Sequence, residues 1–205
     1  MSILLAIHIL SGSLALVAAA VAIGSAKGKK HHILAGKTYV LAMLGIFLSA
    51  IPMAIITSNL FLFLVAIFSF YMAFAGMRFA RNRKGIATNI DWVAIGLMLL
   101  SGAGMLALST AYFLTDNPLA IVLLVFGLLS ISLGYQDLRA YRDQTLKGPQ
   151  RIARHLSNMM GGTIAVTTAV LVVNVNIEPS WVTWVLPSAL ITPVIIWWNR
   201  KVLSS

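Results

Sequence analysis

Long blocks of apolar residues alternate with short polar stretches along the chain, and there are seven such blocks. A run of about 20 apolar residues can cross the hydrocarbon core of a membrane as a helix. The apolar residues are not confined to one stripe of each block, so each helix would be apolar on all sides, which suits a helix surrounded by lipid. The pattern predicts an all-α fold, an integral membrane bundle of seven transmembrane helices, as a single domain over residues 1–205. The predicted spans are about 3–24, 38–56, 60–80, 92–114, 119–137, 155–175 and 181–198.

Composition agrees with this pattern. The chain is 60% hydrophobic and 10% charged, whereas about 25% of the residues of a soluble domain are charged. The absence of cysteine excludes disulfides, thiolate metal ligands and a cysteine nucleophile.

The charges are distributed unevenly between the two ends of the predicted bundle. All fifteen Lys and Arg residues lie near connections on one side, and the connections on the other side carry only Asp116 and Glu178. Basic residues collect on the cytoplasmic side of membrane proteins. We therefore expect the N-terminus outside and the C-terminus in the cytoplasm, with the bilayer and anionic lipid headgroups at the cytoplasmic face as partners. The net charge of +10 needs no nucleic acid to explain it.

Small residues in the first predicted span favour close helix packing. Ser11, Ala15 and Ala19 recur at every fourth position and so share one helix face. Asn59 directly precedes the third span, where its side chain is suited to cap the new helix.

Three histidines, His8, His32 and His155, are candidate ligands or proton-relay groups. An ionisable side chain in or near a membrane span costs free energy to bury, so such a residue is a candidate for a functional role. The alternative is structural: neutral histidine can share a hydrogen bond with a neighbouring helix, and His32 falls in a basic connection. A haem or metal ion is a further possibility. His8 and His155 should lie roughly 20 Å apart along the membrane normal. Only His32 and His155 could then share a metal.

Lys37, Arg151 and Arg154 are candidate ligands for an anion or a lipid headgroup. They lie where the second and sixth helices begin on the predicted cytoplasmic side, and helix N-termini favour anions. The competing interpretation is the general positive-inside distribution with attraction to anionic lipids, which needs no specific ligand.

Several short segments resemble an uncharacterised family of multi-pass bacterial membrane proteins, catalogued as domain of unknown function 2306. These segments are His8–Gly12, Lys27–Tyr39, Phe68–Arg78, Asp91-Trp92 and Arg154-His155 with the Met, Gly and Thr residues that follow. The resemblance implies a bacterial inner-membrane protein and directs attention to His8, His32 and His155. It implies no activity, because the family has none established.

We predict a binding or transport-type role in the membrane for a small molecule, lipid or ion. No catalytic triad, phosphate loop or metalloprotease motif is present, so the sequence gives no enzyme signature. No cofactor is predicted. One alternative is a haem- or metal-binding redox protein that uses the histidines, and another is an accessory subunit of a membrane complex. A homo-oligomer or a membrane partner subunit is compatible with each of these roles.

Overall fold

The computed structural model describes residues 1–204, which form seven α-helices and no β-strand. Each helix is long and apolar enough to cross a membrane, which fits a multi-pass membrane protein. The prediction of an all-α bundle of seven such helices is confirmed. The helices are α1 (Ser2–Gly24), α2 (Lys30–Ile56), α3 (Leu60–Arg81), α4 (Asn89–Phe113), α5 (Leu119–Arg142), α6 (Gly148–Asn174) and α7 (Trp181–Leu203).

Several helices extend beyond the predicted spans, and the largest differences lie at one end of the bundle. α2 begins at Lys30 instead of residue 38, α6 begins at Gly148 instead of residue 155, and α5 continues to Arg142 instead of ending at residue 137. An apolar run marks only the part of a helix that suits lipid, whereas a helix can continue through polar residues once its backbone hydrogen bonds are formed. His32, Arg151 and Arg154 therefore lie within helices and not in connections, which corrects the sequence-based placement.

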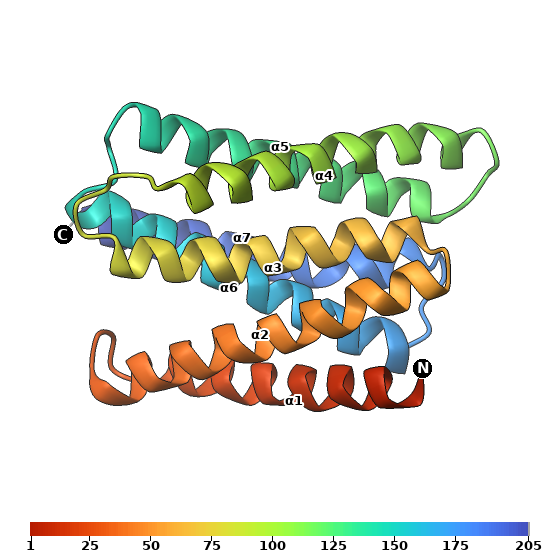
Figure 1. The fold of residues 1–205 in the computed structure, drawn as a ribbon, viewed down its shortest axis with the longest axis horizontal. Coiled ribbons are helices and arrows are strands. Elements are labelled where there is room, and N and C mark those ends of the chain that lie inside the picture. The colour runs from red at the N-terminus through yellow and green to blue at the C-terminus, as the bar shows by residue number, and fades with distance from the viewer. Residues whose placement is uncertain (205) are drawn as a thin grey trace.

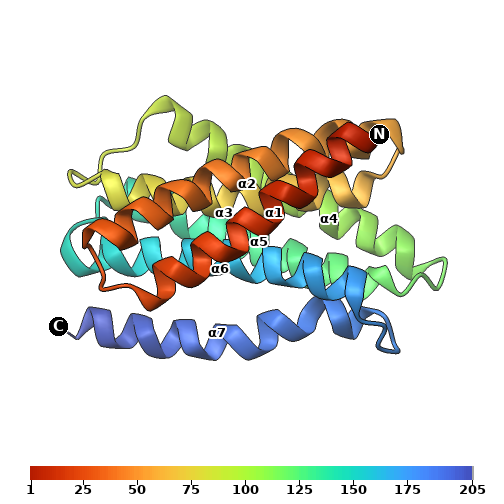
Figure 2. The ribbon, with the colours of Figure 1, turned by 90° about the horizontal axis from the view of Figure 1, so that it is seen from below.

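The helices run alternately up and down, and α3 lies near the centre (Figures 1 and 2). It packs against α2, α4, α5 and α6. Half of its most apolar stretch is buried inside the bundle, against 17% for α1 and α7. The outer helices thus present most of their apolar surface outward, as lipid contact requires.

The main core lies between α3, α4 and α5. The buried α3 side chains recur at spacings of three or four residues, which places them on one helix face. They are Phe61, Leu64, Phe68, Tyr71, Met72, Ala75 and Phe79. The Asn59 side chain accepts a hydrogen bond from the Leu62 backbone N–H at 3.0 Å, so the predicted cap of α3 is confirmed.

The predicted small-residue face of α1 lies against α2. Ala15 and Ala19 are buried. A Cβ at Gly45 of α2 would lie 2.5 Å from Ser11 Oγ, so these helices are in close contact. Small residues allow this approach, as expected for helices in lipid.

α5 and α6 are consecutive in sequence, yet they do not pack against each other. α4 and α5 form a hairpin that reaches the remaining helices through α3 and α7. Any interaction between α5 and α6 must therefore come from long side chains.

Candidate functional site

The connections at the two ends of the bundle differ in charge. The α1–α2, α3–α4 and α5–α6 connections lie at the same end as the C-terminus, and the N-terminus lies at the opposite end (Figure 1). All fifteen Lys and Arg residues are in these connections, in the helix turns near them or in the last turn of α7. We call this end the basic end. In the α1–α2 connection the ammonium of Lys27 lies 4.9 Å from the ring centre of Trp198, and partial burial lowers the pKa of this lysine.

A buried carboxylate lies near the basic end. Asp137 of α5 has no exposed surface, and its Oδ1 lies 2.7 Å from Nη2 of Arg154 on α6. The hydroxyl of Tyr71 on α3 donates a hydrogen bond of 2.7 Å to Asp137 Oδ2. A buried charge is tolerated only when it is paired and hydrogen-bonded. Asp137 therefore joins three helices through one side chain.

The neighbouring Asn158 supports this cluster from α6. It is fully buried, and its Nδ2 donates to the Arg154 carbonyl at 3.1 Å. This bond fixes the rotamer of Asn158 beside the Asp137 carboxylate.

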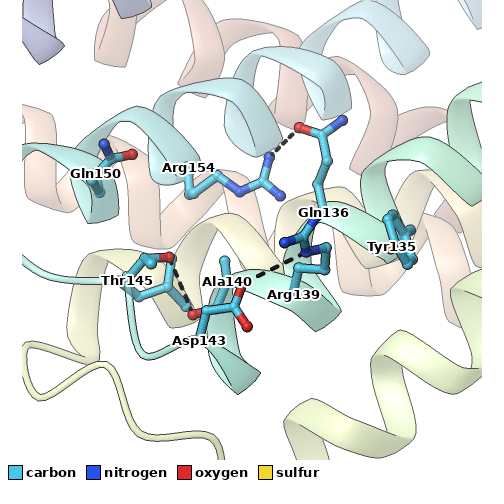
Figure 3. Close-up of a pocket in the computed structure, with 9 residues that line it drawn as sticks. Tyr135, Gln136, Arg139, Ala140, Asp143, Thr145, Gln150 and Arg154 are labelled. Atoms are coloured by element: carbon cyan, nitrogen blue, oxygen red, sulfur yellow. Dashed lines mark hydrogen bonds and ion pairs between the residues drawn. The ribbon is translucent and has the colours of Figure 1, made fainter.

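Arg154 also faces a polar hollow where α5 and α6 diverge. Its Nη1 donates to Gln136 Oε1 at 3.0 Å, and Figure 3 shows the two side chains directed toward each other. Nearby, Arg139 lies 3.6 Å from Asp143 in an exposed ion pair. The hollow has a volume of about 340 Å³. Its lining residues are Tyr135, Gln136, Arg139, Ala140, Asp143, Thr145, Leu146, Gln150 and Arg154.

The three predicted anion ligands occupy different environments. Arg151 Nη1 donates to the carbonyls of Phe79 and Ala80, both at 2.7 Å, so this side chain caps the C-terminus of α3. Lys37 is exposed on α2 and has no hydrogen-bond or ion-pair partner among the described residues. Arg154 alone of the three lines the hollow.

A second buried ion pair has a structural explanation. Arg78 of α3 binds both carboxylate oxygens of Asp91 at 2.7 Å. Asp91 also accepts a hydrogen bond from the Thr88 backbone N–H at 2.8 Å, forming the capping box of α4. This pair fixes the α3–α4 connection.

The three predicted histidines separate into one residue and one pair. His8 lies near the start of α1 (Ser2–Gly24), and the N-terminus lies at the end opposite the basic end (Figure 1); its Nδ1 is 3.1 Å from Ser49 Oγ on α2. The rings of His32 and His155 lie together, with their centres 6.3 Å apart. The structure therefore places His8 far from His155 along the bundle. Within residues 1–204 no group of three or more His, Asp and Glu side chains is placed to hold a metal ion.

The apolar pattern does not predict that Asp137 is buried. It places this residue at the end of the fifth predicted span and indicates no ion-pair or hydrogen-bond partner for it. A signal was nonetheless present. Ser130, Gly134, Asp137 and Tyr141 follow one another at spacings of three or four residues, and all are buried. Asp137 thus lies on the core-facing stripe of α5. Its partner Tyr71 comes from a distant part of the sequence, and only the fold brings them together.

Comparison of the chain with family models, with curated proteins and with solved structures found no match. The resemblance to domain of unknown function 2306 therefore stays a prediction.

Proposed function

We propose that this chain is a multi-pass membrane protein of the binding or transport class, and that its ligand carries a phosphate or carboxylate group. The ligand binds in the hollow between α5 and α6, where Arg154 receives it. The observation that supports this proposal is the position of Arg154, which pairs with the buried Asp137 on one side and lines the hollow on the other.

The chemistry of arginine suits this double role. A guanidinium carries five N–H donors in a planar fork that matches carboxylate and phosphate oxygens. Arg154 uses Nη2 toward Asp137 and Nη1 toward Gln136, at 2.7 and 3.0 Å. Gln136 lies on the exposed side of α5 and can yield its contact at little cost. An incoming anion thus has a donor that is already oriented by a buried carboxylate.

The exposed Arg139 adds a second positive charge to the wall of the hollow, and Asp143 partly offsets it. The ion pair between them is loose and exposed, and such pairs contribute only about 0.2–1 kcal/mol. Arg139 is therefore free to turn toward a bound anion. A ligand that draws Arg154 away from Asp137 would also loosen the link between α5 and α6, which is the kind of coupling that a transport step needs.

The test is thermal unfolding of the detergent-purified protein, followed by tryptophan fluorescence. Inorganic phosphate is titrated in one arm, and micelles containing phosphatidic acid or phosphatidylcholine are compared in another. Stabilisation by free phosphate indicates a soluble ligand, and stabilisation by phosphatidic acid alone indicates a lipid headgroup. We expect R154Q to lose the ligand-dependent shift and R142Q, an exposed arginine outside the hollow, to keep it.

A second variant separates binding from folding. Gln150 is an exposed residue that lines the hollow, so Gln150→Phe should fill the hollow and leave the Arg154–Asp137 pair intact. It should abolish the shift without lowering the unfolding temperature of the unliganded protein. The absence of any shift in the wild type with either probe, or an equal shift in Q150F, would overturn the proposal.

We further propose that the basic end faces the cytoplasm of a bacterial cell, with the N-terminus outside and the protein in the inner membrane. The one-sided distribution of Lys and Arg supports this orientation. The cysteine-free chain allows a direct test. A membrane-impermeant maleimide should label N176C in intact cells and K84C only after permeabilisation. The reverse labelling pattern would invert the topology.

A further inference from the structure

The pair formed by His32 of α2 and His155 of α6 is separate from the hollow and has no part in the proposed anion site. We propose that these two imidazoles bind a monovalent copper ion, Cu(I), through their Nε2 atoms.

Backbone contacts set both rings in the orientation of metal ligands. His155 Nδ1 lies 2.8 Å from the Gly76 carbonyl oxygen, and His32 Nδ1 lies 3.0 Å from the Ala22 carbonyl oxygen. A carbonyl oxygen only accepts hydrogen bonds, so each Nδ1 must carry the proton. In the neutral rings the lone pair then lies on Nε2, and no hydrogen bond to another residue in the described part of the chain occupies either Nε2. Metal-binding histidines are held in the same way, with the other ring N–H donated to a carbonyl.

The separation of the rings fits one shared ion. If each metal–nitrogen bond is about 2 Å and each ring centre lies about 1.2 Å behind its nitrogen, opposed ligands put the ring centres about 6.4 Å apart. The observed separation is 6.3 Å, and the rings are nearly perpendicular, at 87°. A tetrahedral angle between the ligands would require centres only about 5 Å apart. If the two Nε2 atoms turn toward each other, this separation gives a wide, nearly linear arrangement, which two-coordinate Cu(I) accepts.

Charge and softness also favour Cu(I) over a divalent ion. Arg151 lies one turn before His155 on α6, and no third His, Asp or Glu joins the pair within residues 1–204. A divalent ion would lack the carboxylate that offsets its charge. Met159 lies one turn after His155, and its Sδ packs against Gly76, the residue that holds His155. A thioether is a soft donor of the kind that selects Cu(I).

The test is a Cu(I) titration of the purified protein under a reductant, in competition with a chromophoric Cu(I) chelator. The wild type should bind one ion per chain. His32→Ala and His155→Ala should each weaken binding at least tenfold. His31→Ala is the matched control, because this neighbour is exposed and has no ring contact or side-chain hydrogen bond with the pair among the described residues, so its loss should leave binding unchanged.

X-ray absorption of the copper-loaded wild type keeps the proposal falsifiable if a histidine variant fails to fold. It should show a low-coordinate Cu(I) edge with two imidazole nitrogens in the first shell. Four outcomes would overturn the assignment. These are no copper binding, equal loss in H31A and H32A, zinc binding in place of Cu(I) with the same dependence on the variants, and a Soret band that identifies haem iron.

Discussion

Replacing Arg154 with glutamine should strongly destabilise the protein, because it leaves the Asp137 carboxylate buried without its counter-charge. Asp137 has no exposed surface and Arg154 is 15% exposed, with 2.7 Å between the paired atoms. Removing one partner of such a pair costs about 3–5 kcal/mol. The Tyr71 hydrogen bond remains, so we expect a loss toward the lower end of this range.

The chain contains a matched control for this prediction. Arg139 and Asp143 form an ion pair at 3.6 Å, with side chains that are 63% and 51% exposed. Solvent-exposed pairs contribute about 0.2–1 kcal/mol. Arg139→Gln should therefore lower the free energy of unfolding by no more than about 1 kcal/mol, although it removes the same charge only two residues from Asp137 in the chain.

A double substitution tests the cause of the loss. Asp137→Asn combined with Arg154→Gln leaves no unpaired charge in the bundle, so the double variant should be more stable than R154Q alone. The measurement is reversible unfolding in mixed micelles by increasing sodium dodecyl sulfate, followed by circular dichroism. The reasoning is refuted if R154Q costs no more than R139Q, or if the double variant is no more stable than R154Q.

Three further substitutions follow from the packing, and the same unfolding assay measures each of them. Tyr71→Phe removes a donor to a buried carboxylate and should cost about 1.5–3 kcal/mol; a loss below that range would show that the hydrogen bond contributes little. Arg78→Gln leaves Asp91 only 3% exposed and without its bidentate partner, so it should cost about 3–5 kcal/mol, and no loss would contradict the role of this pair. Gly76→Ala places a Cβ 2.7 Å from a methionine sulfur and 3.1 Å from a backbone nitrogen of α6, which should cost about 1–3 kcal/mol. Gly12→Ala is its control, since nothing lies within 4 Å there, and equal losses would show that the α3–α6 contact is not tight.

The apolar pattern predicts the seven helices correctly because each block is long enough to cross a bilayer by itself, so no information about tertiary contacts is needed. The Asn59 cap is also predictable from the sequence, because its hydrogen bond joins residues only three positions apart. Helix ends at the basic end are less predictable. Lys30 and Gly148 begin helices among polar residues, where hydropathy gives no signal and the packing of α2 and α6 on α3 decides.

The candidate site depends on contacts that the sequence does not contain. The Asp137 hydrogen bond joins residues 66 positions apart in the chain, and the His155 bond to Gly76 spans 79 positions. Residue type alone identifies His155 as a candidate, because histidine near a span is unusual. It does not identify Arg154 as the partner of a buried acid, since fourteen other basic residues share the same end.

The absence of packing between α5 and α6 explains why ligand binding at Arg154 should act on the α4–α5 hairpin. The two helices of this hairpin pack closely on each other and meet the other helices through α3 and α7. Arg154 reaches Asp137 from α6 as an ion pair across the remaining gap, and Asn158 of the same helix also contacts this carboxylate. A ligand that competes for Arg154 weakens this link and leaves the hairpin held by its apolar contacts with α3 and α7. The free energy needed to leave Asp137 without its partner then sets how tightly the ligand must bind before the hairpin can move.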